Sequence, residues 1–287
     1  MPTGFHIQLL LFTTLSPAGA VAFILVALRI VSAPRNAPWL FRLQRSLLIP
    51  IALCMLGLVI AATHLGTPRN ALYVLLGVGR SPLSNEMAAT LAFLSLAWLF
   101  WLSLATRRLP LNVGKAWLAV TCVAACIMIY AVSVAYSIPT VPVWNLPISP
   151  ALCWFSALVL GAPLALLTLG VARAPLPHSA ARAIVGVQAL GTVAELGAMA
   201  LLHRSLAPIS SALVSADALV PHFWWFVSAF AILSGLSIAL ALRAQAPRIS
   251  EQPRTARRRL AAATALAAGA VVCVRVPFYV LSLTVGV

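Results

Sequence analysis

Long runs of apolar residues alternate with short polar connections along the whole chain. Eight runs of about 20 residues recur, which is the length that an α-helix needs to cross ~30 Å of hydrocarbon. They lie near 8–31, 46–65, 88–106, 116–137, 151–172, 181–203, 223–243 and 260–286. Apolar residues within the runs do not alternate with a period of two, and this favours helices over a β-barrel. The pattern predicts an all-α integral membrane bundle of eight transmembrane helices, with residues 1–287 as a single domain.

Composition agrees with a membrane location. Hydrophobic residues make up 62% of the sequence and charged residues 8%, and a water-soluble fold could not cover its core with so few polar side chains. The first run lacks the basic start of a signal peptide and is too long for its apolar region. We therefore expect this run to be retained as a helix.

Positive charge is concentrated in alternate connections, and this distribution explains the formal net charge of +15. Fifteen of the 19 Lys and Arg residues lie in the first, third, fifth and seventh connections, and three lie elsewhere in connections, at Arg69, Arg80 and Arg204. Because basic connections stay in the cytoplasm, both termini are predicted to lie outside it. The charge is thus read as a topology signal with membrane lipid as a contact, and no nucleic-acid partner is expected.

A histidine and a carboxylate stand at the adjoining ends of the second and third runs. His64 begins the stretch HLGTP that closes one run, and Glu86 follows Ser84 and Asn85 where the next run opens. Both side chains can accept protons near neutral pH, and both are costly close to hydrocarbon. One external connection joins the two ends, so His64 and Glu86 are expected at similar depth. The alternative is that Ser84 or Asn85 caps the N-terminus of the next helix and that the Glu86 carboxylate interacts favourably with the positive N-terminal end of the helix dipole.

Two further charges are predicted deep in the membrane. Glu195 and Arg275 lie about 21 Å along the sixth and eighth runs from their inner ends, at 1.5 Å per residue. An isolated charge in hydrocarbon is unfavourable, so each is expected inside the bundle with a partner or water. The sequence leaves open a structural ion pair or a pair that lines a site. Pro277 predicts a kink close to Arg275.

Metal chemistry within the protein is not expected. The five cysteines fall inside the apolar runs without a CxxC spacing, so they are interpreted as small apolar residues; they are Cys54, Cys122, Cys126, Cys153 and Cys273. Paired histidines facing across helices are not found either. We therefore predict no haem and no iron–sulfur cluster in this chain. His203 and His222, at outer ends of runs, are left without an assigned role.

The connection from Ser137 to Pro147 is unusual for an exposed loop. It has no charged residue and contains Pro139, Pro142 and Pro147. An apolar and stiff surface of this kind suits a partner protein or a lipid-soluble ligand. Packing against the bundle is the other interpretation.

Several short motifs together resemble one known family, the DmsC-type membrane anchor of dimethyl-sulfoxide-reductase-like molybdoenzymes. The pair HLGTP at His64 and LSNE at Leu83 carries most of this resemblance. Supporting segments are GFH at Gly4, Tyr136 with TVPVW at Thr140, ALVP at Ala218, and Arg275 with Phe278-Tyr279 and TVG at Thr284. The resemblance extends over nearly the whole sequence.

The resemblance implies a non-catalytic anchor subunit in the bacterial inner membrane that serves anaerobic electron transport. Such an anchor holds a [4Fe-4S] ferredoxin-like subunit and a molybdopterin catalytic subunit, and exchanges electrons with menaquinone or ubiquinone as diffusible quinol. The family's quinol-site histidine and glutamate correspond to His64 and Glu86, and Arg275 is expected to support them. Its chemistry fits, because quinol oxidation releases two protons that a base has to accept.

Three other functions are weighed against this one. A related dehydrogenase, for example a sulfite-oxidising one, would use the same anchor to reduce quinone. A proton-coupled transporter would use Glu195 and Arg275 and would need discontinuous helices around a central cavity. A di-haem cytochrome b anchor would need paired axial histidines. His64 and His203 could form one pair, but a second is missing.

Overall fold

The computed structural model describes residues 7–63, 68–105, 110–209, 215–245 and 253–282, and its regular elements in these ranges are helical. The α-helices are α1 (Ile7–Val31), α2 (Leu40–Ser46), α3 (Leu48–Ala62), α4 (Pro82–Ser103), α5 (Leu111–Ala135), α6 (Ser149–Ala172), α7 (His178–Arg204), α8 (Phe223–Gln245) and α9 (Pro253–Val280). Two 3-10 helices, η1 (Pro68–Gly77) and η2 (Asp217–Leu219), lie in connections.

Eight of the described helical stretches are long and apolar enough to cross a membrane, which confirms the predicted fold class. The second stretch, Leu40–Ala62, consists of α2 and α3 separated at Leu47. Pro50 explains the break, because it has no N–H for the carbonyl of Ser46 and its ring clashes with that turn. The predicted run near 46–65 corresponds to α3, and the short helix α2 that precedes it in a less apolar stretch was not predicted.

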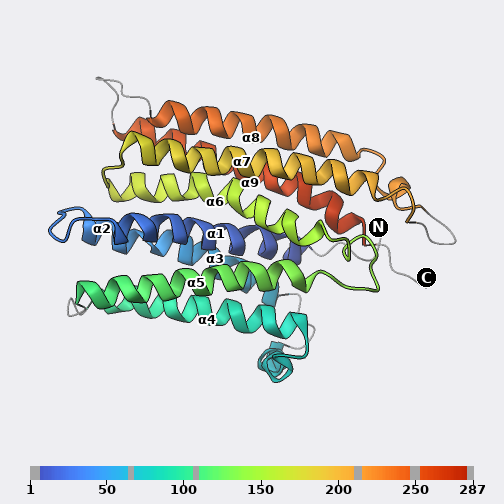
Figure 1. Ribbon diagram of the computed structural model, residues 1–287, viewed down its shortest axis with the longest axis horizontal. Coiled ribbons are helices and arrows are strands. Elements are labelled where there is room, and N and C mark those ends of the chain that lie inside the picture. Colours follow the sequence, from blue (N-terminus) through green and yellow to red (C-terminus); the bar gives the residue numbers. More distant parts are fainter. Residues whose placement is uncertain (1–6, 64–67, 106–109, 210–214, 246–252, 283–287) are drawn as a thin grey trace.

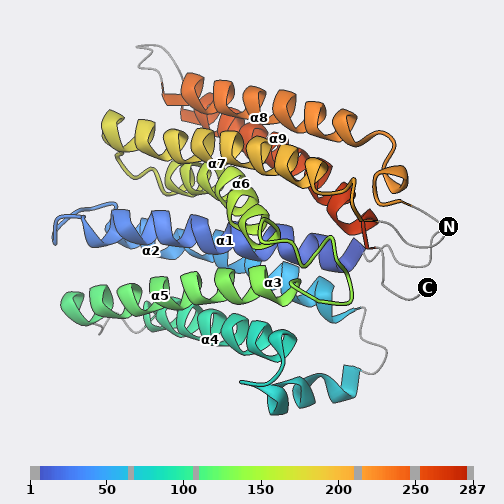
Figure 2. The same cartoon turned by 45° about the vertical axis from the view of Figure 1, so that its right-hand side comes forward.

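The long helices lie side by side in a broad array (Figure 1). At one edge α4 packs on α5, and in the middle α1 packs on α3, α5 and α6. The other edge is formed by α6, α7, α8 and α9, with α8 and α9 in extensive contact. Figure 2 shows the same order after rotation, with α1 and α6 joining the two halves. The core is therefore centred on α1 and α6.

The two ends of the bundle differ in chemistry. The start of α1 and the finish of α9 lie at the same end (Figure 1). We call this the aromatic end; α3, α5 and α7 also finish there. The opposite end, where α1, α4, α6 and α8 finish, is called the basic end. Glu86 and Asp217 lie toward the aromatic end, whereas Arg35, Arg42 and Lys115 lie at the basic end.

Small residues bring the central helices into close contact. A Cβ placed on Gly161 of α6 would lie 2.6 Å from the Cβ of Val21 and 2.8 Å from the carbonyl oxygen of Ala18, both on α1. Ser16 and Cys54 fasten α1 to α3 by two bonds, from Ser16 Oγ to the Cys54 carbonyl (3.0 Å) and from Cys54 Sγ to the Ser16 carbonyl (3.1 Å). Helices in a membrane associate through such close packing and hydrogen bonds.

Gly161→Ala is expected to destabilise the bundle by about 1–3 kcal/mol, the usual penalty for overpacking a dense core. Its methyl group would meet the backbone of α1, which cannot rotate away as a flexible side chain does. Gly197→Ala is the matched control, since an added Cβ there meets nothing within 4 Å. The measurement is the midpoint of unfolding of the purified protein in detergent. Equal midpoints for the two variants would contradict the packing described here.

Candidate functional site

Glu86 is placed inside α4 rather than at its cap. The helix starts at Pro82, with Ser81 as the N-cap, so Glu86 is in the second turn and only 4% exposed. Asn85 does not cap the helix, because its Oδ1 accepts a bond from the Gly79 N–H (2.7 Å) in the preceding turn. The capping interpretation of Ser84, Asn85 and Glu86 was therefore wrong. A carboxyl group so far into a helix does not reach the free N–H groups of the first turn.

The surroundings of Glu86 connect it to other helices. Its carboxyl group lies within electrostatic range of the Tyr136 hydroxyl at the end of α5 and of the Cys153 thiol in α6. Burying a carboxyl group in a membrane protein is energetically unfavourable, and ionisable residues at such positions commonly belong to functional sites. Glu86 thus faces the interior of the bundle at the aromatic end.

Four aromatic side chains form a compact cluster at this end. They are Tyr136, Trp144, Phe278 and Tyr279. The rings of Trp144 and Phe278 stack, with centroids 5.7 Å apart and planes 9° apart. Tyr136 meets Tyr279 edge to face at 5.8 Å, and Trp144 meets Tyr279 at the same distance. Such arrangements are favourable for aromatic pairs.

The connection between α5 and α6 packs against the bundle at this cluster. Trp144 Nε1 donates to the carbonyl of Phe278 (2.8 Å), which is near the end of α9 and lacks a helical donor. Ser149 Oγ donates to the carbonyl of Val143 (3.1 Å), and Val143 is fully buried. Of the two interpretations of this loop, packing is therefore observed. Pro139 remains exposed.

Tyr279 ties the end of α9 to the start of α1. Its hydroxyl shares a hydrogen bond with Thr13 Oγ1 (2.9 Å) and donates to the carbonyl of Leu9 (3.2 Å). Tyr279 also has an edge contact with Phe278, 5.5 Å between centroids. Contacts between the first and last helices thus close the aromatic end.

Arg275 and Glu195 lie deeper in the bundle than this cluster and are 3% and 1% exposed. The guanidinium lies within electrostatic range of Cys153, Tyr279 and Glu195. It does not form a direct ion pair with Glu195 within the described residues, so the expected pairing is electrostatic only. Ser156 Oγ donates to Glu195 Oε1 (3.0 Å).

Both charged groups have unused hydrogen-bonding capacity. Arg275 Nε and Nη2 are buried and have no hydrogen-bond partner in the part of the protein that the structure describes, and the same is true of Glu195 Oε2. Buried polar atoms usually have partners, so the two unpaired nitrogens indicate a missing acceptor. A quinone or quinol oxygen, or water, has the required chemistry. The flat rings of Phe278 and Tyr279 next to this guanidinium suit an aromatic ligand; the Phe278 ring centre is 6.0 Å from the guanidinium carbon.

Other polar groups at the aromatic end include Asp217, His203 and His222. Asp217 begins η2, and its Oδ1 accepts the Ala218 N–H (3.0 Å). A hydrogen bond from Ser215 keeps the pKa of the Asp217 carboxyl below its usual value. His203 stacks on Phe223 with centroids 4.8 Å apart, and its buried Nδ1 has no hydrogen-bond partner among the described residues. His222 is exposed.

His64 lies outside the described residues, so its approach to Glu86 stays a prediction. Within the described ranges, no group of three His, Cys, Asp or Glu side chains is arranged to hold a metal ion. Sequence reasoning did not select Tyr136, Tyr279, Thr13 or Ser156 as site residues. Tyrosines at helix ends resemble ordinary interface residues, and small hydroxyl residues are common in membrane helices, so neither signal is strong.

Several known proteins are similar to this one. The family model described as the DMSO reductase anchor subunit (DmsC) matches residues 1–281. The anaerobic dimethyl sulfoxide reductase subunit YnfH of Escherichia coli K12 is 31% identical over 224 residues, which are 78% of either sequence. The C subunit of anaerobic dimethyl sulfoxide reductase from the same organism is 30% identical over 244 residues, which are 84% of either sequence. The C subunit of the Haemophilus influenzae enzyme is 30% identical over 145 residues, about half of either sequence.

Proposed function

Because the chain belongs to the family of DMSO reductase anchor subunits, we propose that it anchors an oxidoreductase complex in the bacterial inner membrane and exchanges electrons with quinol. Its partners are a [4Fe-4S] ferredoxin-like subunit and a molybdopterin catalytic subunit. The observation that carries the quinol site is Arg275, a buried cation with unpaired nitrogens, within the described residues, beside the aromatic cluster. A quinol oxygen would supply the acceptor that these nitrogens lack.

The residues of the aromatic end divide the chemistry between them. Arg275 hydrogen-bonds one ring oxygen, and the aromatic cluster covers a face of the ring. His64 accepts a proton from the other hydroxyl group as the quinol is oxidised, and Glu86 passes protons toward the surface. Each quinol releases two protons and two electrons. The buried position of Glu86, at the near end of α4, is compatible with this transfer.

The electrons leave through a docked partner. A [4Fe-4S] cluster is normally held by four cysteine thiolates, and the five cysteines of this protein are free thiols spread over the four helices α3, α5, α6 and α9. The ferredoxin-like subunit therefore brings the acceptor to the quinol. The exposed part of the α5–α6 connection, at Pro139 and Thr140, belongs to the same loop as Trp144 and is the surface that we assign to this contact.

The helices around Glu195 argue against a transporter. Transporters bind their substrates where helices are interrupted near the middle of the membrane. Helix α7 carries Glu195 and runs without a break from His178 to Arg204, and α6, which carries Ser156, is also continuous. Helix α9 is continuous as well, with Pro277 close to its end. The anchor function therefore accounts better for the buried charges.

The aromatic end is assigned to the outer side of the membrane, because the basic connections mark the cytoplasmic side. A reporter fused after Val287 is expected to be active only if it is of the kind that works outside the cytoplasm. A cytoplasmic reporter inserted between residues 246 and 252 is expected to be active. Activity of a cytoplasmic reporter at Val287 would show that the protein has the opposite orientation in the membrane.

The function is tested by purifying the protein from native membranes. A ferredoxin-like subunit and a molybdopterin subunit are expected to co-purify, and reduced menaquinone should drive turnover of that complex. A soluble dye that feeds the catalytic subunit directly is the control. Purification without such partners, or a complex that the dye drives and no quinol does, would refute the proposal.

A further inference from the structure

A cavity of about 410 Å³ lies at the basic end, opposite to the end that holds the aromatic cluster. It is formed between the finish of α1, α2, the finish of α4 and the start of α5. Most of its wall is aliphatic, including Leu40, Leu104, Leu111 and Leu118. The polar groups are Arg35, Gln44, Ser103 and Lys115. Its volume is within the range of small-ligand sites.

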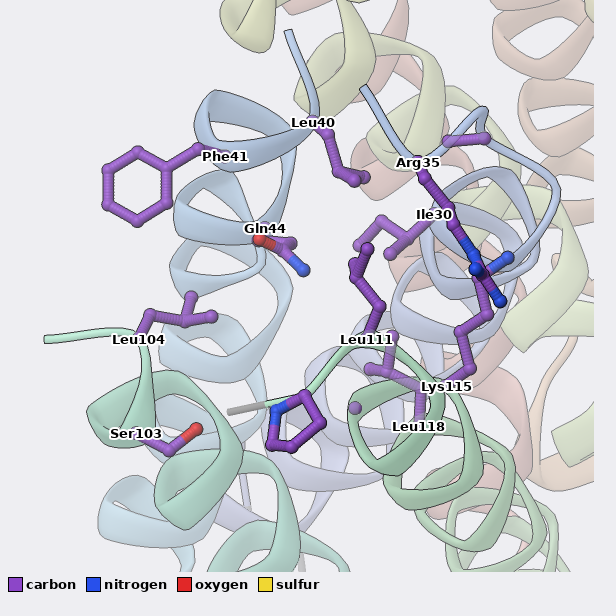
Figure 3. Close-up of a pocket in the computed structure, with 13 residues that line it drawn as sticks. Ile30, Arg35, Leu40, Phe41, Gln44, Ser103, Leu104, Leu111, Lys115 and Leu118 are labelled. Carbon is purple, nitrogen blue, oxygen red and sulfur yellow. The ribbon is translucent and has the colours of Figure 1, made fainter. Parts of the chain in front are cut away.

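Two cations share one wall of this cavity. Figure 3 shows Arg35 and Lys115 on one side, with Phe41, Ser103 and Leu104 on the other. Arg35 Nη2 donates to Asn112 Oδ1 at 3.3 Å, and that acceptor is uncharged. Two positive groups on one wall repel each other unless an anion lies between them.

The sequence contains few acidic residues that could pair with Arg35 and Lys115. It contains only four acidic residues, Glu86, Glu195, Asp217 and Glu251. The first three belong to the half of the bundle toward the aromatic end, and Glu251 lies outside the described residues. Within the described ranges, Arg35 and Lys115 therefore have no carboxylate partner on this wall. An anionic ligand would complete the site.

The depth of the cavity is marked by tryptophans. Trp101 Nε1 donates to the carbonyl of Arg45 (2.9 Å), and Trp117 Nε1 donates to the carbonyl of Leu96 (3.0 Å). Tryptophans gather at the level of lipid headgroups. Lys115 is two residues from Trp117, and Gln44 is next to Arg45. The cavity thus lies where phosphates meet acyl chains.

We propose that this cavity binds one anionic phospholipid of the adjacent leaflet. Its phosphate lies between Arg35 and Lys115, and Gln44 and Ser103 face its polar ester region. One acyl tail begins along Leu104, Leu111 and Leu118 and continues into the bilayer. Basic pockets between transmembrane helices bind such headgroups by the same charge complementarity. This site does not depend on the quinol site at the other end.

The test measures phosphatidylglycerol bound to the purified full-length protein by native mass spectrometry, with phosphatidylcholine as the neutral lipid. The double variant Arg35→Gln/Lys115→Gln is expected to bind phosphatidylglycerol about thirty-fold more weakly, as follows from two cations near a phosphate. Its binding of phosphatidylcholine should not change. The matched control is Arg182→Gln/Arg243→Gln, which removes the same charge at the same end but outside the cavity.

A second variant separates the cavity from surface charge. Leu111→Trp keeps both cations and fills the apolar part of the cavity, so it is expected to weaken phosphatidylglycerol binding. Added inorganic phosphate is expected not to change phosphatidylglycerol binding by the unchanged protein or by this variant. The proposal is overturned if both variants bind phosphatidylglycerol as the unchanged protein does. It is also overturned if the Arg182→Gln/Arg243→Gln control loses as much phosphatidylglycerol binding as the cavity variant. The same holds if inorganic phosphate displaces the bound phosphatidylglycerol, or if Leu111→Trp releases bound quinone and not phosphatidylglycerol.

Discussion

Replacing His64 with alanine is expected to abolish quinol-driven turnover of the complex, with a loss of about a hundredfold or more, as for removal of a general base. Turnover driven by a soluble dye should be unchanged, because only the membrane step loses its proton acceptor. His64 follows α3 by two residues, and this helix finishes with Ala62 at the aromatic end. The measurement compares initial rates with quinol and with dye on the same purified complex.

The companion variant is Glu86→Gln. It is expected to slow quinol-driven turnover by about tenfold with a KM for quinol within about twofold of normal, the pattern of a group that acts on protons more than on binding. Asp217→Asn is the matched control, because that carboxylate is at the same end but exposed and bonded within its own turn. Normal quinol-driven rates and normal inhibitor binding in both the His64 and Glu86 variants would show that the quinol site lies elsewhere.

Replacing Arg275 with glutamine is expected to weaken quinol binding by about ten- to a hundred-fold, the effect of losing charge-assisted hydrogen bonds in a buried site. It removes a guanidinium that has two unpaired nitrogens within the described structure and that lies near Glu195 and Tyr279. The measurement is the KM for quinol together with the amount of folded protein in the membrane.

Arg204→Gln controls for loss of one positive charge, since Arg204 ends α7 at the same end and is exposed. Glu195→Gln separates a structural role from a binding role. If Arg275 only balances Glu195, the double variant Arg275→Gln/Glu195→Gln should recover normal quinol kinetics. If Arg275 binds quinol, the double variant should remain impaired. Recovery would therefore contradict the assignment of Arg275 to the ligand.

The sequence allowed most residues of the candidate site to be named, but not the contacts between them to be predicted. Glu86, Glu195 and Arg275 are recognisable because ionisable residues within apolar runs are costly. The burial of Glu195 and Arg275 agrees with that reasoning, whereas Glu86 was expected at the outer opening of its run and its burial is a finding of the structure. A direct ion pair between Glu195 and Arg275 could not be inferred safely, since helix rotation decides which way each side chain points. The aromatic cluster was missed as a unit because its members come from three separate segments.

The sequence by itself determined the all-α class and the eight membrane-spanning helices, because hydrocarbon thickness imposes a run length that can be counted along the residues. The short motifs HLGTP and LSNE, rather than run length, indicated the family. Only the tertiary structure decided that Glu86 is buried within a helix, that Trp144 covers Phe278, and that Tyr279 bonds to Thr13. It also decided that Arg35 and Lys115 share a cavity. These contacts join residues distant in sequence, and they depend on how helices rotate and pack, which hydrophobicity along the sequence does not encode.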